Sequence, residues 1–580
     1  MTNDLQNSHR GIDGHLVMIL VSMFLAMAGV SSGMAQGSVG GTSDPVHVQV
    51  DLSKRVGPYT PIYRWFGYDE SNYTTMKYGK QLLRELHDLS PEPVYIRAHH
   101  LLTSGNGVAE LKWSSSNVFS LDANGKPVYD FTITDQTFDE YQRAGVRPFV
   151  ELGFMPKDLA AEVEGISEYQ LHYPKPTMGG SVNNPPKDYA MWGELVRKFT
   201  EHLVQRYGRE QVKTWYFEVW NEPDIIYWHG TEAEYLKLYD YAVAGVRAAL
   251  PEAKVGGPST TGPGSEKASA YLDGFLRHCL NEKSAANGKP VPLDFISFHP
   301  KGHPETVDGH VRMGLAAELK AAKAGFEIVA KFPQLRKVPI VLSEADPEGC
   351  AACSMKVNPA NAYRNGPLYA TYTAAAMKGL FDLQDESQVN LAGMLSWSFE
   401  FEGKEYFEGF RTLATNGIDK PVLNVFRMAG LMAGDRVEAS STRTIGTDEI
   451  LKSGVRSSAD VDAMATRAER QAAVMVWNYH DDDLPAAKAH VKVTVSGVPA
   501  EVTRVLLQHY RIDETHSNSY SVWKQMGSPQ TPTIEQYARL KEAGRLELLN
   551  SPEWLDVHDG QVTVEMELPR QATSLLKLAW

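Results

Sequence analysis

Short apolar segments alternate with amphipathic stretches along residues 62–435, the pattern of repeated strand–helix units. The eight candidate strands cover residues 63–68, 94–99, 147–153, 215–221, 253–258, 294–299, 338–344 and 392–398. Amphipathic helices are predicted near 80–89, 135–144, 188–206, 232–250, 268–283, 314–331, 366–383 and 421–433. Eight such units predict an α/β fold, a (β/α)8 TIM barrel with enlarged loops over residues 62–435.

The pattern changes at about residue 436 to short segments in which apolar and polar residues alternate. Candidate strands there are Ala473–Trp477, Val491–Val495, Arg504–His509, Val562–Leu568 and Ser574–Leu578, with Gly, Pro and Asp between them. This pattern predicts an accessory antiparallel β-sandwich over residues 436–580. Val46–Leu52 alternates in the same way, so residues 36–61 are expected to add a strand to that domain.

The N-terminus has the order of a secretory signal peptide. Arg10 precedes an apolar run, Leu16–Val30, and small residues follow up to Ala35. The run is shorter than the roughly 20 residues that a membrane-spanning helix needs. We therefore expect residues 1–35 to be removed and the mature protein to be secreted or periplasmic, without a membrane anchor.

Composition narrows the classes of function. With 43% hydrophobic residues in 580, the chain can bury a large core. Its formal net charge is 57 − 71 = −14, without long basic runs, so nucleic acid is excluded as a partner. Three cysteines are too few for a disulfide framework, and Cys350-x-x-Cys353 forms either a local disulfide or two free thiols.

Two acids stand at the carboxyl ends of predicted strands. Asn221 and Glu222 end the fourth strand, in Trp215-Tyr-Phe-Glu-Val-Trp-Asn-Glu-Pro223, and Glu344 follows the seventh. Barrel enzymes build their active sites at this face, so both acids are expected at one rim. An apolar strand that delivers a carboxylate to its tip needs a reason, because burying a charge is costly.

Glycoside hydrolysis supplies that reason, because it needs two carboxyl groups on either side of one bond. A separation of roughly 5–5.5 Å allows direct attack and retention of configuration. Glu222 is then the acid and later the base, and Glu344 is the nucleophile. The chemistry needs no cofactor and no metal.

The chain resembles glycoside hydrolase family 39, which contains β-xylosidases and α-L-iduronidases. The segments that carry the resemblance are Tyr95–Leu102, Phe217–Asp224, Gly256–Ser259, Asp294–His299 and Gly417–Val422. The resemblance implies that Arg97 and His99 support the nucleophile and contact the sugar. It also implies that His299 contacts the substrate and that Trp397 is the aromatic sugar platform.

Two positions depart from the β-xylosidase pattern. Lys301 stands where xylosidases place a Tyr, and Arg411 lies in an Arg-Thr-Leu that resembles the iduronidases. Two cations would suit a sugar carboxylate, so a uronide such as an iduronide is slightly favoured over a neutral xyloside. Glu400 or Glu402 is expected to bind a hydroxyl; of these, Glu400 is taken as the candidate.

The leading hypothesis is therefore an exported retaining exo-glycosidase that acts on a carbohydrate. The alternatives are a neutral-pentose β-xylosidase, an endo-acting polysaccharide hydrolase and a catalytically idle carbohydrate-binding protein. Association into a homo-oligomer is a further hypothesis.

Overall fold

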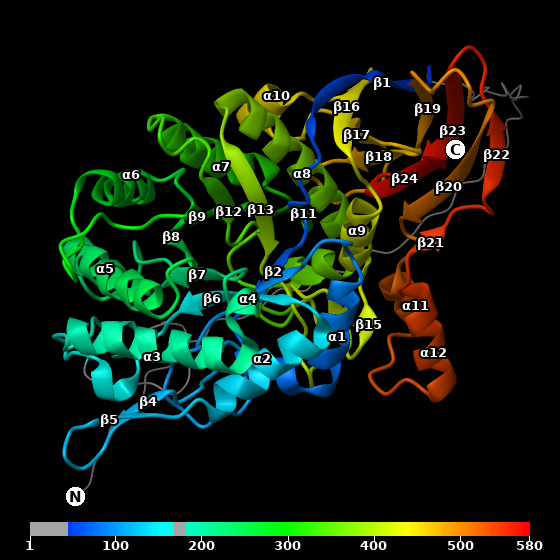
Figure 1. The fold of residues 1–580 in the computed structure, drawn as a ribbon. Coiled ribbons are helices and arrows are strands. Elements are labelled where there is room, and N and C mark those ends of the chain that lie inside the picture. Colours follow the sequence, from blue (N-terminus) through cyan, green and yellow to red (C-terminus); the bar gives the residue numbers. More distant parts are fainter. Residues whose placement is uncertain (1–43, 167–180) are drawn as a thin grey trace, which may run out of the picture. The chain divides into compact units, whose positions relative to one another are not determined.

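Eight parallel strands close into a barrel in the computed structural model (Figure 1). In order around the barrel they are β2 (Trp65–Tyr68), β3 (Tyr95–Ala98), β6 (Arg147–Leu152), β7 (Tyr216–Val219), β8 (Lys254–Thr261), β9 (Phe295–His299), β12 (Pro339–Leu342) and β13 (Asn390–Ser396). Each corresponds to one predicted strand, so the predicted barrel is confirmed. The structure describes residues 44–166 and 181–580; the predicted signal peptide lies outside them.

Helices follow the barrel strands in the predicted alternation. They are α1 (Lys77–His87), α2 (Thr132–Ala144), α3 (Tyr189–Tyr207), α4 (Arg209–Val212), α5 (Glu232–Ala249), α6 (Glu266–Asn281), α7 (Leu315–Ala330), α8 (Pro367–Ser387) and α9 (Pro421–Gly430). Local sequence marks their starts: Thr231 and Glu234, for example, form a capping box at the start of α5. Within the described ranges, no helix is long and apolar enough to span a membrane.

The enlarged loops contain short elements of their own. These are β4 (Phe119–Leu121), β5 (Pro127–Tyr129), β10 (Glu305–Val307), β11 (His310–Arg312), β14 (Ala414–Thr415), β15 (Ile418–Asp419) and the 3-10 turns η1 (Ser71–Thr75), η2 (Lys157–Leu159), η3 (Ser181–Asn183) and η4 (Pro359–Asn365). Cys350 and Cys353 form a disulfide in the loop after β12, and Cys279 is a buried thiol.

A second, mostly antiparallel sheet forms the accessory domain. Its strands are β1 (Val46–Pro58), β16 (Asp435–Ser441), β17 (Asp460–Ala468), β18 (Gln471–Tyr479), β19 (Ala489–Ser496), β20 (Arg504–Ile512), β21 (Glu547–Leu548), β22 (Glu553–Asp556), β23 (Gln561–Leu568) and β24 (Ala572–Ala579). Three helices accompany them: α10 (Thr447–Ser453), α11 (Ser519–Gln525) and α12 (Ile534–Ala543). The N-terminal strand β1 pairs with β16 and, in parallel, with β19.

The accessory sheet folds back on itself. The strand order is β21-β20-β24-β18-β17-β16-β1-β19-β23, so β23 and β24 lie six places apart. A flat sheet would separate them by about 29 Å, at about 4.8 Å per strand. Only residues 569–571 join them, however, and so short a link reaches about half that distance at most. The continuous sheet therefore encloses its own core, in the manner of a sandwich.

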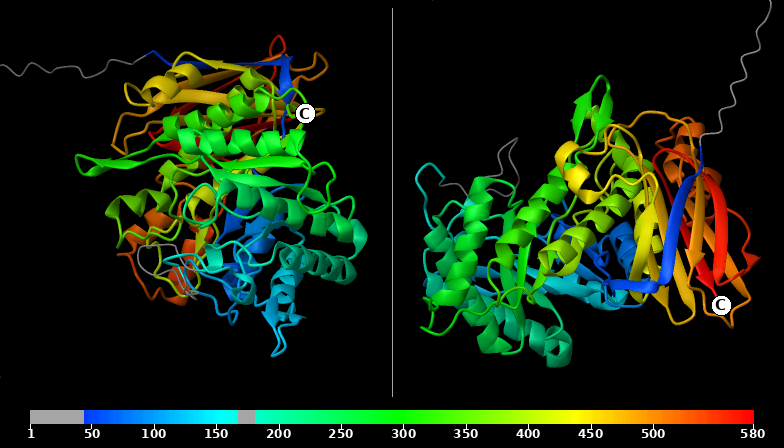
Figure 2. Two further views of the ribbon diagram at one scale, coloured as in Figure 1. Left: turned by 90° about the vertical axis from the view of Figure 1, so that its left-hand side faces the viewer. Right: turned by 90° about the horizontal axis from the view of Figure 1, so that it is seen from above.

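The central accessory strands are buried on both faces. Val474 and Val476 of β18 face the core of the sheet, whereas Met475 and Trp477 belong to the core of the barrel. Helix α8 packs on β18 and β24, and it lies between the barrel strands and the sheet (Figures 1 and 2).

Candidate active site

The carboxyl ends of the barrel strands bring most of the predicted residues together. Arg97 is on β3, His299 ends β9, and Glu222 and Glu344 stand just beyond β7 and β12. Glu222 has a positive φ of 42°, and its backbone N–H donates to the Ser259 carbonyl at 2.8 Å. Left-handed backbone is costly for a residue with a side chain, and here a neighbouring strand holds it in place.

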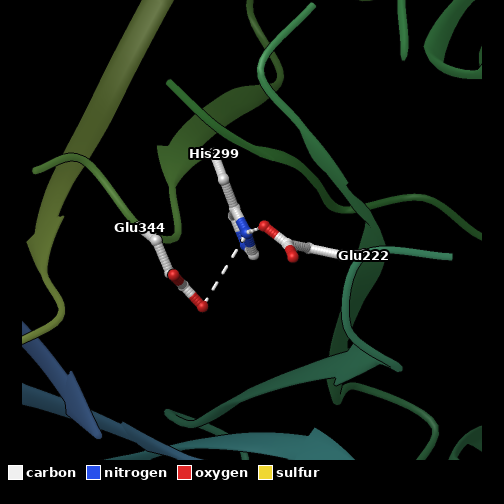
Figure 3. Close-up of side chains that lie close together, drawn as sticks. All are labelled: Glu222, His299 and Glu344. Atoms are coloured by element: carbon white, nitrogen blue, oxygen red, sulfur yellow. Dashed lines mark hydrogen bonds and ion pairs between the residues drawn. The ribbon is translucent and has the colours of Figure 1, made fainter. Parts of the chain in front are cut away.

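The two predicted catalytic acids lie on either side of His299 (Figure 3). One oxygen of Glu222, one oxygen of Glu344 and one nitrogen of His299 all lie within 4.8 Å of one another. His299 Nδ1 is 2.9 Å from Glu222 Oε1 and 3.8 Å from Glu344 Oε1. The carboxyl groups are thus close to the separation of roughly 5–5.5 Å that retaining glycosidases use.

Glu344 is held in its ionised form. Its Oε2 accepts a hydrogen bond from Lys301 Nζ at 2.7 Å, and its Oε1 accepts one from Arg97 Nη1 at 3.2 Å. Burial alone would raise the pKa of Glu344, but the two cations lower this pKa well below its usual range. A carboxylate in this state is suited to nucleophilic attack.

The environment of Glu222, by contrast, favours the protonated form of its carboxyl group. Burial, helped by the nearby charge of Glu344, raises the pKa of Glu222 to about 8. Burial also lowers the pKa of His299 to about 3, so its imidazole is neutral. Since a neutral imidazole nitrogen accepts a hydrogen bond, His299 Nδ1 can accept the proton of the Glu222 carboxylic acid. Two acids with separated pKa values suit an acid and a nucleophile.

Arg97 holds three buried carboxylates at once. Besides Glu344, it pairs with Glu218 at 2.6 Å and Glu151 at 2.8 Å, and its Nη2 donates to Asn221 Oδ1 at 3.0 Å. Neither Glu151 nor Glu218 was among the site residues predicted from the sequence. An acid inside an otherwise apolar strand, as in Phe149-Val-Glu-Leu152 and Tyr216-Phe-Glu-Val219, is the signal that identifies them.

His99 lies between two carboxylates that favour its protonated form. Its Nδ1 lies 2.8 Å from Asp69 Oδ1, and its Nε2 lies 3.1 Å from Glu151 Oε2. Burial opposes the charge, but Glu151 and Asp69 outweigh it and raise the pKa of His99 to about 10. Both nitrogens therefore already have carboxylate partners, which supports a positioning role for His99 better than donation to a sugar hydroxyl.

Lys301 and Arg411 are joined through the carboxylate of Asp346, which was not among the residues predicted from the sequence. Lys301 Nζ donates to Asp346 at 2.8 Å, and Arg411 Nη2 is 3.4 Å from the same carboxylate. Arg411 Nη1 also pairs with Glu348 at 2.6 Å, and the whole side chain is buried. Asp346 and Glu348 stand two and four residues after Glu344, so a run of acids past a strand tip is the signal for them.

Trp397 and Glu400 occupy different surroundings. The Trp397 ring lies 4.3 Å from that of His99 and 4.9 Å from the Arg97 guanidinium. Gly67 makes room for it, because a Cβ there would lie 2.5 Å from the indole. Glu400, by contrast, accepts a hydrogen bond from the Gly417 N–H at 2.6 Å, and its charged neighbours are Glu85, Asp419 and Glu402. Among the described residues, no hydrogen bond or ion pair joins Glu400 to Glu222 or Glu344.

Glu222, His299 and Glu344 also have the donor types of a metal site. Lys301 and Arg97 already neutralise Glu344, however, and their charge opposes a bound cation. The arrangement therefore suits acid–base and nucleophilic chemistry better than metal binding.

Two known glycosidases are similar to this chain in sequence. A β-xylosidase of Caldicellulosiruptor saccharolyticus is 28% identical over 452 residues, covering 76% of this chain and 81% of that protein. The α-L-iduronidase of Mus musculus is 24% identical over 537 residues, covering 86% of this chain and 75% of that protein.

Among solved structures, a monomeric β-xylosidase of Caulobacter crescentus CB15 superposes with a TM-score of 0.71 and 21% identity, covering 92% of this chain and 99% of that one. The model of the family described as "Glycosyl hydrolases family 39" matches residues 46–548. This chain therefore belongs to glycosyl hydrolase family 39, and it is a glycoside hydrolase that acts on carbohydrates.

Proposed function

We propose that the protein is a retaining exo-glycosidase in which Glu344 is the nucleophile and Glu222 is the general acid and base. The observation that carries this proposal is the pair of neighbouring carboxyl groups with opposite pKa shifts: lowered at Glu344, and raised to about 8 at Glu222. Near neutral pH one group is a carboxylate and the other still holds its proton, as double displacement requires.

The reaction then follows from the protonation states. Glu344 attacks the anomeric carbon, while Glu222 gives its proton to the departing glycosidic oxygen. The resulting glycosyl ester on Glu344 is hydrolysed by water, whose proton returns to Glu222. Arg97 and Lys301 hold the carboxylate of Glu344 in place and keep it charged.

The proposed substrate is a terminal neutral pentoside, of which a β-xyloside is the leading example. Lys301 and Arg411, the two cations of the expected uronate clamp, already face Asp346 and Glu348. Arg411 is fully buried, so a sugar carboxylate would reach it only after these contacts rearranged. A further negative charge beside Glu344, Asp346 and Glu348 would also be repelled.

A terminal uronide is the second candidate, and Lys301 is the observation that favours it. Its side chain is 17% exposed, more than that of any other cation bonded to the catalytic pair, so it can meet a ligand. In addition, Arg411 Nη2 is buried without a hydrogen-bond partner among the described residues.

A parallel assay separates the two substrates. Purified mature protein is given 4-nitrophenyl β-D-xyloside, 4-nitrophenyl β-D-glucuronide and a fluorogenic α-L-iduronide, with Glu344→Gln as the blank. We expect cleavage of the xyloside. Cleavage of a uronide instead, with at least a tenfold loss in Lys301→Ala, would transfer the assignment to the second candidate.

Retention and export are tested separately. NMR of the first product formed from the cleaved glycoside should show the anomer of the substrate; the opposite anomer would overturn the double-displacement mechanism.

We also propose that the protein acts outside the cytoplasm, and N-terminal sequencing of the protein exported from a bacterial host should find cleavage near Ala35. An intact N-terminus in the cell pellet would contradict this.

A further inference from the structure

A groove far from the catalytic residues in sequence lies at one end of the accessory sheet. It has a volume of about 740 Å³. Its walls come from the turn between β17 and β18, the connection between β19 and β20, the edge strand β22 and the residue after β24. The lining residues are Arg467, Glu469, Arg470, Pro499, Glu501, Val502, Thr503, Arg504, Trp554 and Trp580.

Trp554 is the most unusual of these side chains. It is 54% exposed, and it is the one aromatic among the strongly exposed large apolar side chains of the described residues. Its backbone belongs to strand β22 (labelled in Figure 1), which pairs with β20. In this pairing Trp554 lies opposite Leu506. The Arg504 guanidinium lies over the ring, 5.7 Å from its centre. The indole therefore projects from a paired strand, with the Arg504 guanidinium near its ring and much of its surface facing solvent.

Trp580 supplies a second indole on the same groove. Its backbone N–H donates to the Arg470 carbonyl at 3.2 Å, and Arg470 Nε donates to the Trp580 carbonyl at 2.7 Å. Its side chain also packs partly against the core of the sheet. The backbones of both tryptophans are therefore placed before any ligand arrives, which lowers the entropy cost of binding.

The polar groups of the groove are balanced in charge. Its three arginines face two lining glutamates, and a third carboxylate, Asp556, pairs with Arg504 at 3.3 Å. Among the described residues, Arg467 and Arg470 form no ion pair with a side-chain carboxylate. Arg467 Nη1 donates to the Leu52 carbonyl and Arg470 Nε to the main-chain oxygen of Trp580, so their other N–H groups can donate to a ligand. Exposed aromatic faces beside both donors and acceptors suit an uncharged polyol better than a polyanion.

We propose that this groove, the Trp554 groove, is a non-catalytic binding site for the pyranose units of a neutral polysaccharide. The apolar C–H face of a pyranose stacks on an indole, and its hydroxyls pair with the arginines and glutamates. Occupation of the groove holds the hydrolase on a polymer whose chain ends the barrel cleaves. The site itself rests on the family membership of the chain. The choice of a xylan as its polymer rests on the proposed xyloside substrate.

Affinity electrophoresis of the full mature chain tests the site. Glu344→Gln serves as the parent protein, so that turnover does not degrade the probe. The gels contain either soluble neutral arabinoxylan or polygalacturonate, an acidic polymer. We expect retardation by arabinoxylan, a loss of affinity of at least tenfold in Trp554→Ala and retention of most of the affinity in Trp554→Phe.

Ile534→Ala is the matched control, because Ile534 is 85% exposed in the same domain but does not line the groove. It should bind arabinoxylan like the parent protein. In the active background, Trp554→Ala should leave kcat/KM on a small aryl glycoside unchanged. No retardation by arabinoxylan, retardation by the acidic polymer alone, or equal affinity in Trp554→Ala would each overturn the proposal.

Discussion

The barrel mouth and the core of the accessory sheet are equally buried but opposite in chemistry. Arg97, Glu151 and Glu218 are completely inaccessible at the mouth, and so are Val493 and Leu576 in the sheet. Buried apolar side chains stabilise a fold in proportion to their area. Buried ion pairs often contribute nothing net, because desolvation offsets their attraction. We therefore attribute the charges at the mouth to the proposed catalysis, and the buried apolar side chains of the sheet to stability.

The largest expected effect comes from removing the negative charge of the nucleophile. Glu344→Gln should lower kcat on any cleaved glycoside by at least about 10³-fold, because no covalent intermediate can form. Its circular dichroism spectrum should match that of the parent protein, since the amide has the same shape. Substantial residual turnover in the purified variant would refute the nucleophile assignment.

The second prediction tests the ion pairs between Arg97 and the buried carboxylates at the barrel mouth. Arg97→Met should destabilise the protein by about 3–5 kcal/mol, because it leaves Glu151, Glu218 and Glu344 buried without their shared cation. Urea unfolding measures the loss of stability, and activity should fall with it. A change below about 1 kcal/mol would mean that the carboxylates take up protons at no cost.

A matched change in the sheet should affect stability alone. Leu576→Ala removes a fully buried side chain from the accessory core, which costs about 2–5 kcal/mol. Its kcat/KM, measured well below its unfolding temperature, should stay within about twofold of the parent value, because ordinary core packing leaves the chemistry intact. A large loss of kcat/KM in the folded variant would show that the two regions are coupled.

The smallest effect is in the pH profile. Since the acid must carry a proton, kcat/KM should fall about tenfold per pH unit above the pKa of Glu222, about 8. The nucleophile sets no limit near neutral pH, because the pKa of Glu344 is lowered. Glu222→Ala, assayed on a dinitrophenyl glycoside that needs no acid, should lose this basic limb; a limb that persists would belong to another group.

Much of the fold could be predicted from local patterns. All eight barrel strands and their helices coincide with the predicted segments, because each strand is an apolar run bounded by polar turns. In the accessory domain, strands β16, β17, β21 and β22 and helices α10, α11 and α12 were not predicted. Strand β17 is buried along most of its length on both faces, which removes the alternation that marks a half-exposed strand.

The site residues at the carboxyl ends of the barrel strands could be predicted from the sequence. Glu222, Glu344 and Arg97 stand at such tips, and the structure places them in contact or within a few ångströms. The partners of these residues were not predictable in the same way. Asp69 comes from the loop after β2, and Asp346 and Glu348 come from the loop after β12, so only the closure of the barrel brings them to His99 and Arg411.

The sequence by itself determined the barrel, the accessory sheet, the family and the two acids proposed as catalytic, because these depend on periodicity and on residue types at the ends of strands. Only the tertiary structure decided the charge state of each acid and the partners of each cation. Glu222 and Glu344 are chemically identical in the sequence. Burial beside a neutral His299 keeps the proton on one, and contact with Lys301 and Arg97 removes it from the other.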